Sequence, residues 1–200
     1  MACSIKPDSV KFLSDPAAII PTYALGIKVT RADSDSLLPD KSTAIIGVKF
    51  ENMLFGNYWH GGITVIKDPA DINVIDTLKY YTQIPVADIK VWALKTISPN
   101  SFVTSGFSDV SSLSGKEIIL TLNGGNITVS PSIDGEYQIL PDGKSMFNQA
   151  KLLQYRKIYL KYKYQDAFGN WCHAQDTLTF RNRIRDGVNE WQDEDPSHYR

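Results

Sequence analysis

The sequence predicts an all-β fold, consisting of an antiparallel β-sandwich or barrel-like domain with one short helix. Apolar and polar residues alternate with period two in most of the apolar segments, as expected for strands with one buried face. Glycine, asparagine and aspartate separate these segments at short intervals, and a helical period of 3.6 is rare. Many short strands divided by tight turns are typical of sandwiches and barrels.

The predicted strands follow one another along most of the chain. Trp92 alternates with Val91 inside one of them and is therefore expected in the core. In chain order the predicted strands are 23–30, 43–50, 62–66, 77–84, 89–97, 116–122, 126–130, 136–140, 156–165 and 171–180.

Turn motifs mark the connections between these strands. The NGG motif at 123–125 joins two apolar runs and predicts a hairpin, because Asn and Gly tolerate positive φ. DG at 134–135 and at 142–143 predicts two further tight turns, and DAFGN at 166–170 closes the last hairpin.

The last hairpin is the best-defined element. Its first strand alternates Ile158, Leu160, Tyr162 and Tyr164 on one face with lysines and Tyr159 on the other. Its second strand separates an apolar set from a polar one. An antiparallel sheet packed on one side fits this pattern. The apolar set is Cys172, Ala174, Leu178 and Phe180, and the opposite set is Trp171, His173, Gln175, Thr177 and Thr179.

Two segments carry helical signals. DPAAII at 15–20 could form one turn, and 145–155 spaces Phe147, Ala150 and Leu153 about one turn apart, with Ser145 as a possible cap. We expect a short helix over 145–155.

A domain boundary is predicted near residue 68. Pro69 and its flanking aspartates interrupt the strand pattern, and the aromatic content rises afterwards. This divides the chain into a first module, 1–68, and a β-sandwich or barrel domain, 69–200, with a polar C-terminal tail.

Composition disfavours several classes of function. The 200 residues carry a formal net charge of −1 and no cluster of five or six Lys and Arg residues, which disfavours nucleic-acid binding. No apolar run approaches the roughly 20 residues of a membrane-spanning helix. Cys3 and Cys172 are too far apart in sequence to indicate a disulfide framework.

Signals for an enzyme, a metal or a cofactor are weak, and we expect none of the three. G-x-S-x-G, P-loop and H-E-x-x-H motifs are missing from the sequence. The loop aspartates at 33, 35 and 40 hint at calcium, but a solvated turn explains them better because the glycine and glutamate of a calcium loop are lacking. Two carboxylate pairs could serve a glycosidase, Asp134 with Glu136 and Glu190 with Asp193.

Aromatic residues give the strongest indication of binding. FGNYWHGG at 55–62 places aromatic side chains among glycines. We interpret it as a strand end that turns at the module junction, with a ligand cleft there as the alternative. Aromatic rings stack on the apolar faces of sugars while nearby polar groups bind hydroxyls. The candidate ligand-binding residues are Tyr58, Trp59, His60 and Trp171, although packing in the core is the alternative for each.

Four segments, 6–33, 41–62, 139–164 and 176–199, resemble a family of Bacteroidetes cell-surface lipoproteins. Members pair an Ig-like N-terminal module with a second β-rich module and are commonly encoded beside SusC/SusD-type glycan-uptake systems. The resemblance implies a partial Ig-like β segment before the main domain. It also implies glycans as ligands, a SusC/SusD-type complex as partner, and a lipid-anchored location on the outer membrane.

The start of the chain departs from that family. About three strands precede residue 57, whereas a complete Ig-like module has about seven, so the first module looks truncated. Cys3 in the opening MAC would suit a lipid-modified cysteine or, equally, a free thiol. The aromatic residues near turns, the missing catalytic motifs and the resemblance together predict a non-catalytic surface glycan-binding lipoprotein. The alternatives are an adhesin-like or scaffolding module that docks a partner, and an accessory part of a glycosidase.

Overall fold

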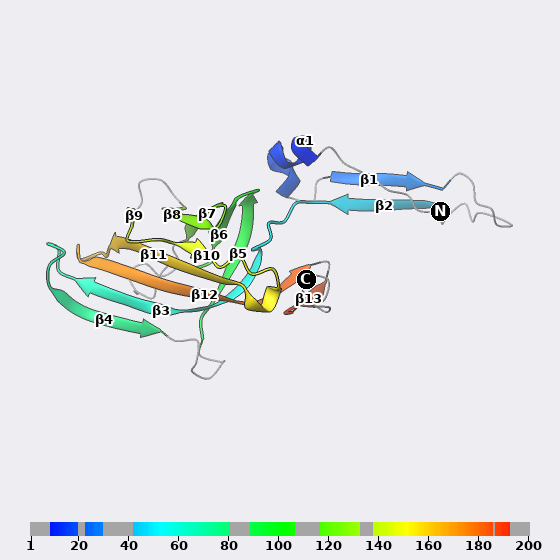
Figure 1. Cartoon of the computed structure of the whole chain (residues 1–200). Coiled ribbons are helices and arrows are strands. Elements are labelled where there is room, and N and C mark those ends of the chain that lie inside the picture. Colours follow the sequence, from blue (N-terminus) through cyan, green and yellow to red (C-terminus); the bar gives the residue numbers. More distant parts are fainter. Residues whose placement is uncertain are drawn as a thin grey trace. The chain divides into compact units, whose positions relative to one another are not determined.

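The computed structural model describes residues 9–19, 23–29, 42–80, 89–106, 117–132, 138–185 and 187–192. Antiparallel strands make up nearly all of its regular structure (Figure 1), which confirms the predicted all-β class. Within these ranges, no helix has the length and apolar character needed to cross a membrane.

The chain divides into two compact units, residues 1–52 and 53–200. The boundary predicted near residue 68 would assign 56–67 to the first module. In the structure this segment is β3 (Gly56–Lys67), and it pairs with β12 (Trp171–Arg185) along nearly its whole length. Strand pairing therefore joins β3 to the second unit, and the division falls before it.

The first unit holds a β-ribbon and two short helical turns. β1 (Tyr23–Lys28) pairs antiparallel with β2 (Thr43–Val48), preceded by α1 (Ser9–Ser14) and η1 (Pro16–Ile19). The turn expected at 15–20 is confirmed as the 3₁₀ helix η1. Two described strands are well short of the roughly seven of a complete Ig-like module.

The second unit is one sheet that closes on itself. Pairing runs in the order β12, β11, β10, β8, β7, β6, β5 and β3, and β3 then pairs with β12. β4, β9 and β13 extend the edges of β3, β11 and β12. The predicted barrel-like domain is this closed sheet. Its remaining elements are β4 (Val74–Tyr80), β5 (Val91–Ser98), β6 (Ser101–Thr104), β7 (Ile118–Asn123), β8 (Asn126–Pro131), β9 (Ile139–Pro141), β10 (Met146–Phe147), η5 (Leu153–Tyr155), β11 (Lys157–Gln165) and β13 (Val188–Glu190).

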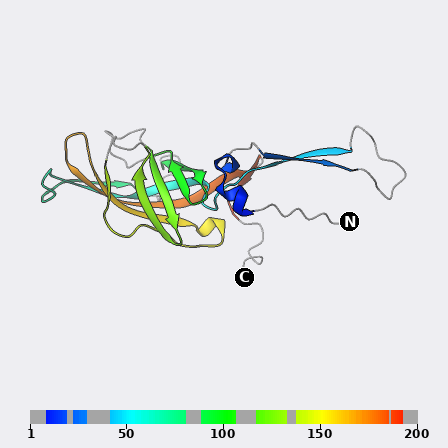
Figure 2. The same ribbon diagram turned by 90° about the horizontal axis from the view of Figure 1, so that it is seen from above.

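Long and short strands form two layers of the closed sheet. Figure 1 shows β11, β12, β3 and β4 running side by side, and Figure 2 shows the green strands lying across the long cyan and orange ones. Side chains on β3, β11 and β12 alternate between the interior and an outward face, as the period-two pattern predicts. The interior holds the apolar core, because one side of every strand in a closed sheet is sealed from water.

The core is aromatic and aliphatic, and it contains both predicted core residues. Trp92 is 3% exposed and Cys172 is fully buried. Burial raises the pKa of the Cys172 thiol to about 11, so this cysteine stays protonated at neutral pH. The other large core side chains include Leu54, Tyr58, Leu94, Phe102, Ile118, Leu120, Phe147, Ile158, Leu160, Tyr162, Tyr164, Leu178 and Phe180.

The helix predicted over 145–155 is wrong. Its first part is the short strand β10, which pairs with β11, and only the single 3₁₀ turn η5 lies near its end. Asn148 accepts from the Lys157 amide (3.0 Å) and donates to the Tyr155 carbonyl (2.7 Å), so its side chain competes with helical hydrogen bonds. Ser145 accepts a 2.8 Å hydrogen bond from the Lys161 amide instead of capping a helix.

Two predicted hairpins are confirmed. The turn at 123–125 joins β7 to β8, with Gly124 at φ +61°. The turn at 166–170 joins β11 to β12, and the Asp166 carboxylate accepts from the Phe168 and Asn170 amides, both at 2.8 Å. The predicted turn at 134–135 lies outside the described residues.

The interpretation of 55–62 as a strand end is also wrong. Residues 56–67 form one continuous strand, and its glycines allow close strand contact in place of a turn. Gly62 has φ +150°, and a Cβ atom there would lie 2.2 Å from the Gln175 carbonyl oxygen on β12. Only glycine fits this point of the β3–β12 pairing.

Candidate functional site

The four predicted ligand-binding residues lie on opposite faces of the closed sheet. Tyr58 and His60 point into the core and are 0% and 2% exposed. Trp59 and Trp171 are half-buried on the outward face. Because side chains alternate along a strand, Trp59 lies on the other face of the sheet from its two neighbours, Tyr58 and His60. The four therefore do not form one site.

The two outward tryptophans are also far apart. On the β3–β12 pair, Trp59 is opposite Thr179 and Trp171 is opposite Lys67, so they are eight residues apart along the strands. At a rise of about 3.3 Å per residue this separation is roughly 26 Å. A different cation lies over each tryptophan ring. Arg181 Cζ is 4.6 Å from the Trp59 ring centroid, and Lys163 Nζ is 4.7 Å from the Trp171 ring centroid.

A buried polar network centres on Asp176 inside the closed sheet. Its Oδ1 accepts from the Tyr80 hydroxyl and its Oδ2 from the Tyr162 hydroxyl, both at 2.6 Å. Burial first, and then the nearby Asp176 carboxylate, raise the pKa of both tyrosines well above the usual range. Both hydroxyls therefore stay protonated and donate to Asp176.

His60 lies beside this network as a packed ring. It stacks on Trp92 with ring centroids 3.9 Å apart, and Tyr80 contacts it at 4.7 Å. His60 Nε2 lies 3.1 Å from Asp176 Oδ1, outside hydrogen-bond geometry, and Nδ1 has no hydrogen-bond partner among the described residues. At this burial, His60 contributes to the interior rather than to a surface that a ligand could reach.

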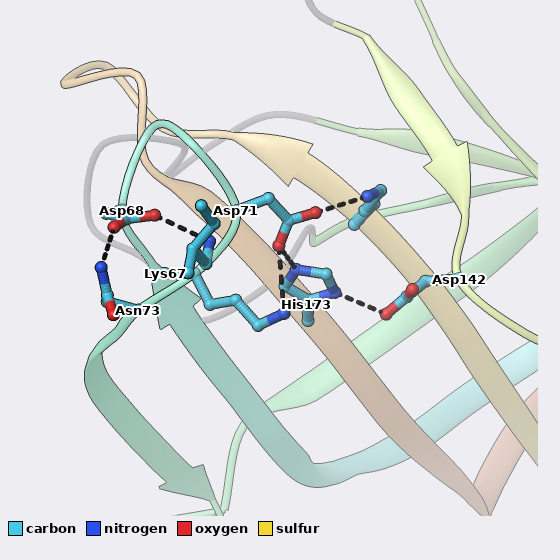
Figure 3. Close-up of polar contacts among 8 residues, drawn as sticks. Lys67, Asp68, Asp71, Asn73, Asp142 and His173 are labelled. Carbon is cyan, nitrogen blue, oxygen red and sulfur yellow. Dashed lines mark hydrogen bonds and ion pairs between the residues drawn. The ribbon is translucent and has the colours of Figure 1, made fainter.

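A second polar cluster lies on the outward face beside Trp171, and Figure 3 shows three of its members, Asp71, Asp142 and His173. We define the Trp171 cluster as Asp71, Asp142, Lys163, Trp171 and His173. Asp71 lies in the turn between β3 and β4, and Asp142 directly follows β9. Lys163 is on β11, and Trp171 and His173 are on β12. Residues that are distant in sequence meet here because β3, β12, β11 and β9 are adjacent strands.

The turn between β3 and β4 positions Asp71. The Asp71 amide donates to the Asp68 carbonyl at 2.9 Å, closing a turn with Pro69 at its second position. The Asp68 carboxylate accepts from the Ile72 amide (2.8 Å) and the Asn73 side chain (2.7 Å), as Figure 3 shows. Asp71 itself has φ +59°, a conformation that Asp adopts more readily than most residues.

His173 bridges two carboxylates. Its Nε2 lies 2.7 Å from Asp71 Oδ1, and its Nδ1 lies 2.8 Å from Asp142 Oδ2 (Figure 3). Both ring nitrogens of His173 thus lie within hydrogen-bond distance of a carboxylate oxygen. Lys163 and Lys67 also contact Asp71, at 2.7 and 3.1 Å. The cluster thus balances carboxylates against cations on a fixed framework.

Asp71 should stabilise the fold at neutral pH and lose that effect in acid. Hydrogen bonds from Lys163 first, then from His173, hold the pKa of Asp71 well below its ordinary value. A depressed folded-state pKa gives stability that is present above the unfolded pKa of about 4 and lost as the pH falls below it. The Tm of Asp71→Asn should therefore lie below that of the unmodified protein at pH about 6, with the gap narrowing below pH about 4. A gap that does not change with pH would contradict this.

Sequence reasoning identified only one member of the cluster as a ligand-binding candidate, Trp171. The last-hairpin pattern placed His173 outward but assigned it no role. Asp71 and Asp142 were not singled out, because they lie about 100 and 30 residues away from His173 and look like ordinary turn residues. The alternation of Lys161 and Lys163 with tyrosines was a usable signal for a basic outward face.

The described residues offer no metal site of three or more His, Cys, Asp or Glu ligands. Asp71 and Asp142 contact opposite nitrogens of His173, so the three cannot converge on one ion. The loop aspartates at 33, 35 and 40, the pair at 134 and 136, and residue 193 lie outside the described residues. Glu190 forms ion pairs with Arg183 and Arg185.

Comparison with known proteins supports the fold. The sequence matches no protein-family profile and no curated protein. A Bacteroides ovatus protein of unknown function has a similar crystal structure, with a TM-score of 0.62 at 18% identity over 92% of this chain. A second B. ovatus protein of unknown function and a multidomain one including DUF1735 match at TM-scores of 0.47 and 0.45, with 14% and 13% identity over 84% and 70% of this chain.

The chain spans less than two thirds of each of these B. ovatus chains, 65%, 62% and 64% of their lengths. The first of them shares the fold of this chain.

Proposed function

We propose that the protein is a non-catalytic glycan-binding protein and that the Trp171 cluster contacts the sugar. The observation that carries this proposal is the half-buried Trp171 ring on the outward face, held by Lys163 and surrounded by fixed polar side chains. An aromatic ring beside preorganised hydrogen-bonding groups matches the apolar face and the hydroxyls of a sugar.

The polar members of the cluster can still bind hydroxyls. Each carboxylate oxygen has two lone pairs, so Asp71 and Asp142 can accept from a sugar while they hold His173. Lys163 has three N–H groups, and one of them contacts Asp71 at 2.7 Å. Since strand pairing and the Asp68 turn fix the framework, little side-chain entropy is lost on binding.

The same geometry disfavours acid–base catalysis at this cluster. A histidine acting as a general base needs a free ring nitrogen, and both nitrogens of His173 face carboxylates. The carboxylates in turn are held by His173 and, for Asp71, by two lysines. Binding without reaction is the function that such a fully paired set supports best.

The cellular setting is also part of the proposal. The resemblance of the sequence to surface lipoproteins, with Cys3 near its start, supports a lipid-anchored protein on the outer membrane. In that setting it would deliver glycans to a SusC/SusD-type uptake complex. Membrane fractionation and co-purification with such a complex test these two points.

Replacing Trp171 with alanine should weaken glycan binding by about ten- to a hundredfold, because one aromatic–sugar stacking contact is removed. Affinity electrophoresis followed by calorimetry against N-glycans, mucin O-glycans and plant polysaccharides measures this effect. Trp191→Ala is the matched control, since Trp191 is 58% exposed and lies outside the cluster. Absence of binding to any glycan, or equal loss in both variants, would refute the proposal.

One observation favours the alternative of a partner-docking module. The β1–β2 ribbon of the first unit carries exposed apolar side chains, with Ile45 81% and Ile46 45% exposed. Exposed apolar side chains on a ribbon suit contact with another protein. This alternative predicts that no glycan binds and that substituting Ile45→Ser abolishes co-purification with the uptake complex.

A further inference from the structure

We infer that the ligand is an anionic glycan and that it lies along the outward face of β11, β12 and β3. This inference rests on the proposed function and adds the chemical class of the sugar. It comes from the distribution of charge over that face, beyond the Trp171 cluster itself.

The three strands themselves contribute cations and no carboxylate to their outward face. β3 and β11 contain no Asp or Glu, and the one acidic residue between Trp171 and Asn182 on β12 is Asp176, which points inward. The carboxylates on this face, Asp71 and Asp142, come from the turns beside the strands and contact His173 and, for Asp71, Lys67 and Lys163. The cationic side chains on the face are Lys67, Lys157, Lys161, Lys163 and Arg181.

Three of these cations are left for a ligand. Lys67 and Lys163 contact Asp71, whereas Lys157, Lys161 and Arg181 have no carboxylate partner in the part of the chain that the structure describes. All three are exposed, and Arg181 lies over the Trp59 ring. Exposed cations without a counter-charge attract anions at short range.

The spacing of these cations suits an extended ligand. Lys157 and Lys161 are four residues apart on β11, about 13 Å, with the exposed Tyr159 between them. Arg181 lies on β12, two residues beyond Thr179, the residue opposite Lys157. A single phosphate or sulfate cannot span such distances, whereas a polymer with repeated sulfate or carboxylate groups can.

The side chains between the cations favour a sugar over nucleic acid. Thr177, Thr179 and Gln175 supply hydroxyl and amide groups along β12. The aromatic residues Trp59 and Trp171 are half-buried at the two ends, so they can stack on sugar rings but cannot intercalate between the stacked base pairs of a duplex. A net charge of −1 gives no long-range attraction to DNA, and binding depends on the local face.

The double variant Lys157→Gln/Lys161→Gln tests the inference. The probes are heparin, polygalacturonate, neutral dextran, chemically desulfated heparin and a DNA duplex, with affinity measured by calorimetry. We expect heparin or polygalacturonate to bind and the double variant to bind it about tenfold more weakly, with affinity falling between about 0.05 and 0.5 M NaCl. The control Lys28→Gln/Lys95→Gln changes the net charge equally at exposed positions outside the face and should bind as the unmodified protein does.

The remaining outcomes separate the two proposals. Binding of neutral glycans such as dextran without a preference for anionic ones overturns the inference and leaves the proposed function standing. Binding of the DNA duplex as tightly as heparin also overturns it, because the face would then be a general polyanion surface. Absence of binding to every glycan tested overturns both proposals. Equal weakening in the test and control variants assigns the effect to net charge and overturns the inference.

Discussion

Asp176→Ala should lower the free energy of unfolding by about 3–5 kcal/mol, the largest effect that we expect from a single polar substitution. Asp176 is 2% exposed and accepts hydrogen bonds of 2.6 Å from the hydroxyls of Tyr80 and Tyr162. Its removal takes one buried acceptor away from the Tyr80 and Tyr162 hydroxyls and opens a space in the interior. Chemical unfolding followed by circular dichroism measures the change.

Two companion variants separate the hydrogen bonds from general disruption of β12. Gln175→Ala changes the exposed neighbouring residue and should alter the stability by no more than about 0.5 kcal/mol. Asp176→Asn keeps the shape and one acceptor oxygen, so its cost should be intermediate, about 1–3 kcal/mol. If Asp176→Ala were as mild as Gln175→Ala, the network would not stabilise the fold.

Gly62→Ala should be nearly as damaging, with a loss of about 3–5 kcal/mol or failure to fold. The added Cβ would lie 2.2 Å from the Gln175 carbonyl oxygen and 3.0 Å from the Tyr80 ring, and φ +150° is strained for any residue with a Cβ. The added Cβ cannot be accommodated by a small shift, because the β12 backbone lies on one side of it and the Tyr80 ring, held by Asp176, lies on the other. Thermal unfolding and soluble yield report the effect.

Gly47→Ala provides the matched comparison. Gly47 also lies in a strand, β2, but a Cβ there would meet nothing within 4 Å. Alanine should be tolerated at that position, with a change within about 0.5 kcal/mol in either direction. Similar losses at the two glycines would show that β-propensity, and not the β3–β12 contact, sets the cost.

The strands could be predicted wherever burial on one side imposes a clear alternation over five residues or more. β11 was predicted nearly to the residue and β12 at its start, because their interior and outward side chains differ sharply there, although β12 continues past residue 180 to Arg185. β6, β10 and β13 have only two to four residues, which is too short for a period to be recognised. The segment 145–155 kept helical spacing by chance, and the hydrogen bonds of Asn148 decided its structure.

The functional site was less predictable because it is assembled across strands. Trp171 stands out in the sequence by residue type, and alternation on β12 places it outward beside His173. Tyr58 and His60 are also residue types that commonly bind sugars. They lie on either side of the outward Trp59 in β3, however, so alternation implies that they point inward. Asp71 and Asp142 come from turns, and only the pairing of β3, β12, β11 and β9 brings them to His173.

Closure of the sheet by β12 has a consequence for synthesis and folding. On the ribosome, β3 emerges long before its partner, since Lys67 is paired with Trp171. Until β12 appears, β3 and β11 each present an unsatisfied edge to other chains, and such edges promote aggregation. Contacts of this sequence separation also slow folding. A nascent chain that stalls before β12 is therefore a natural client for holdase chaperones.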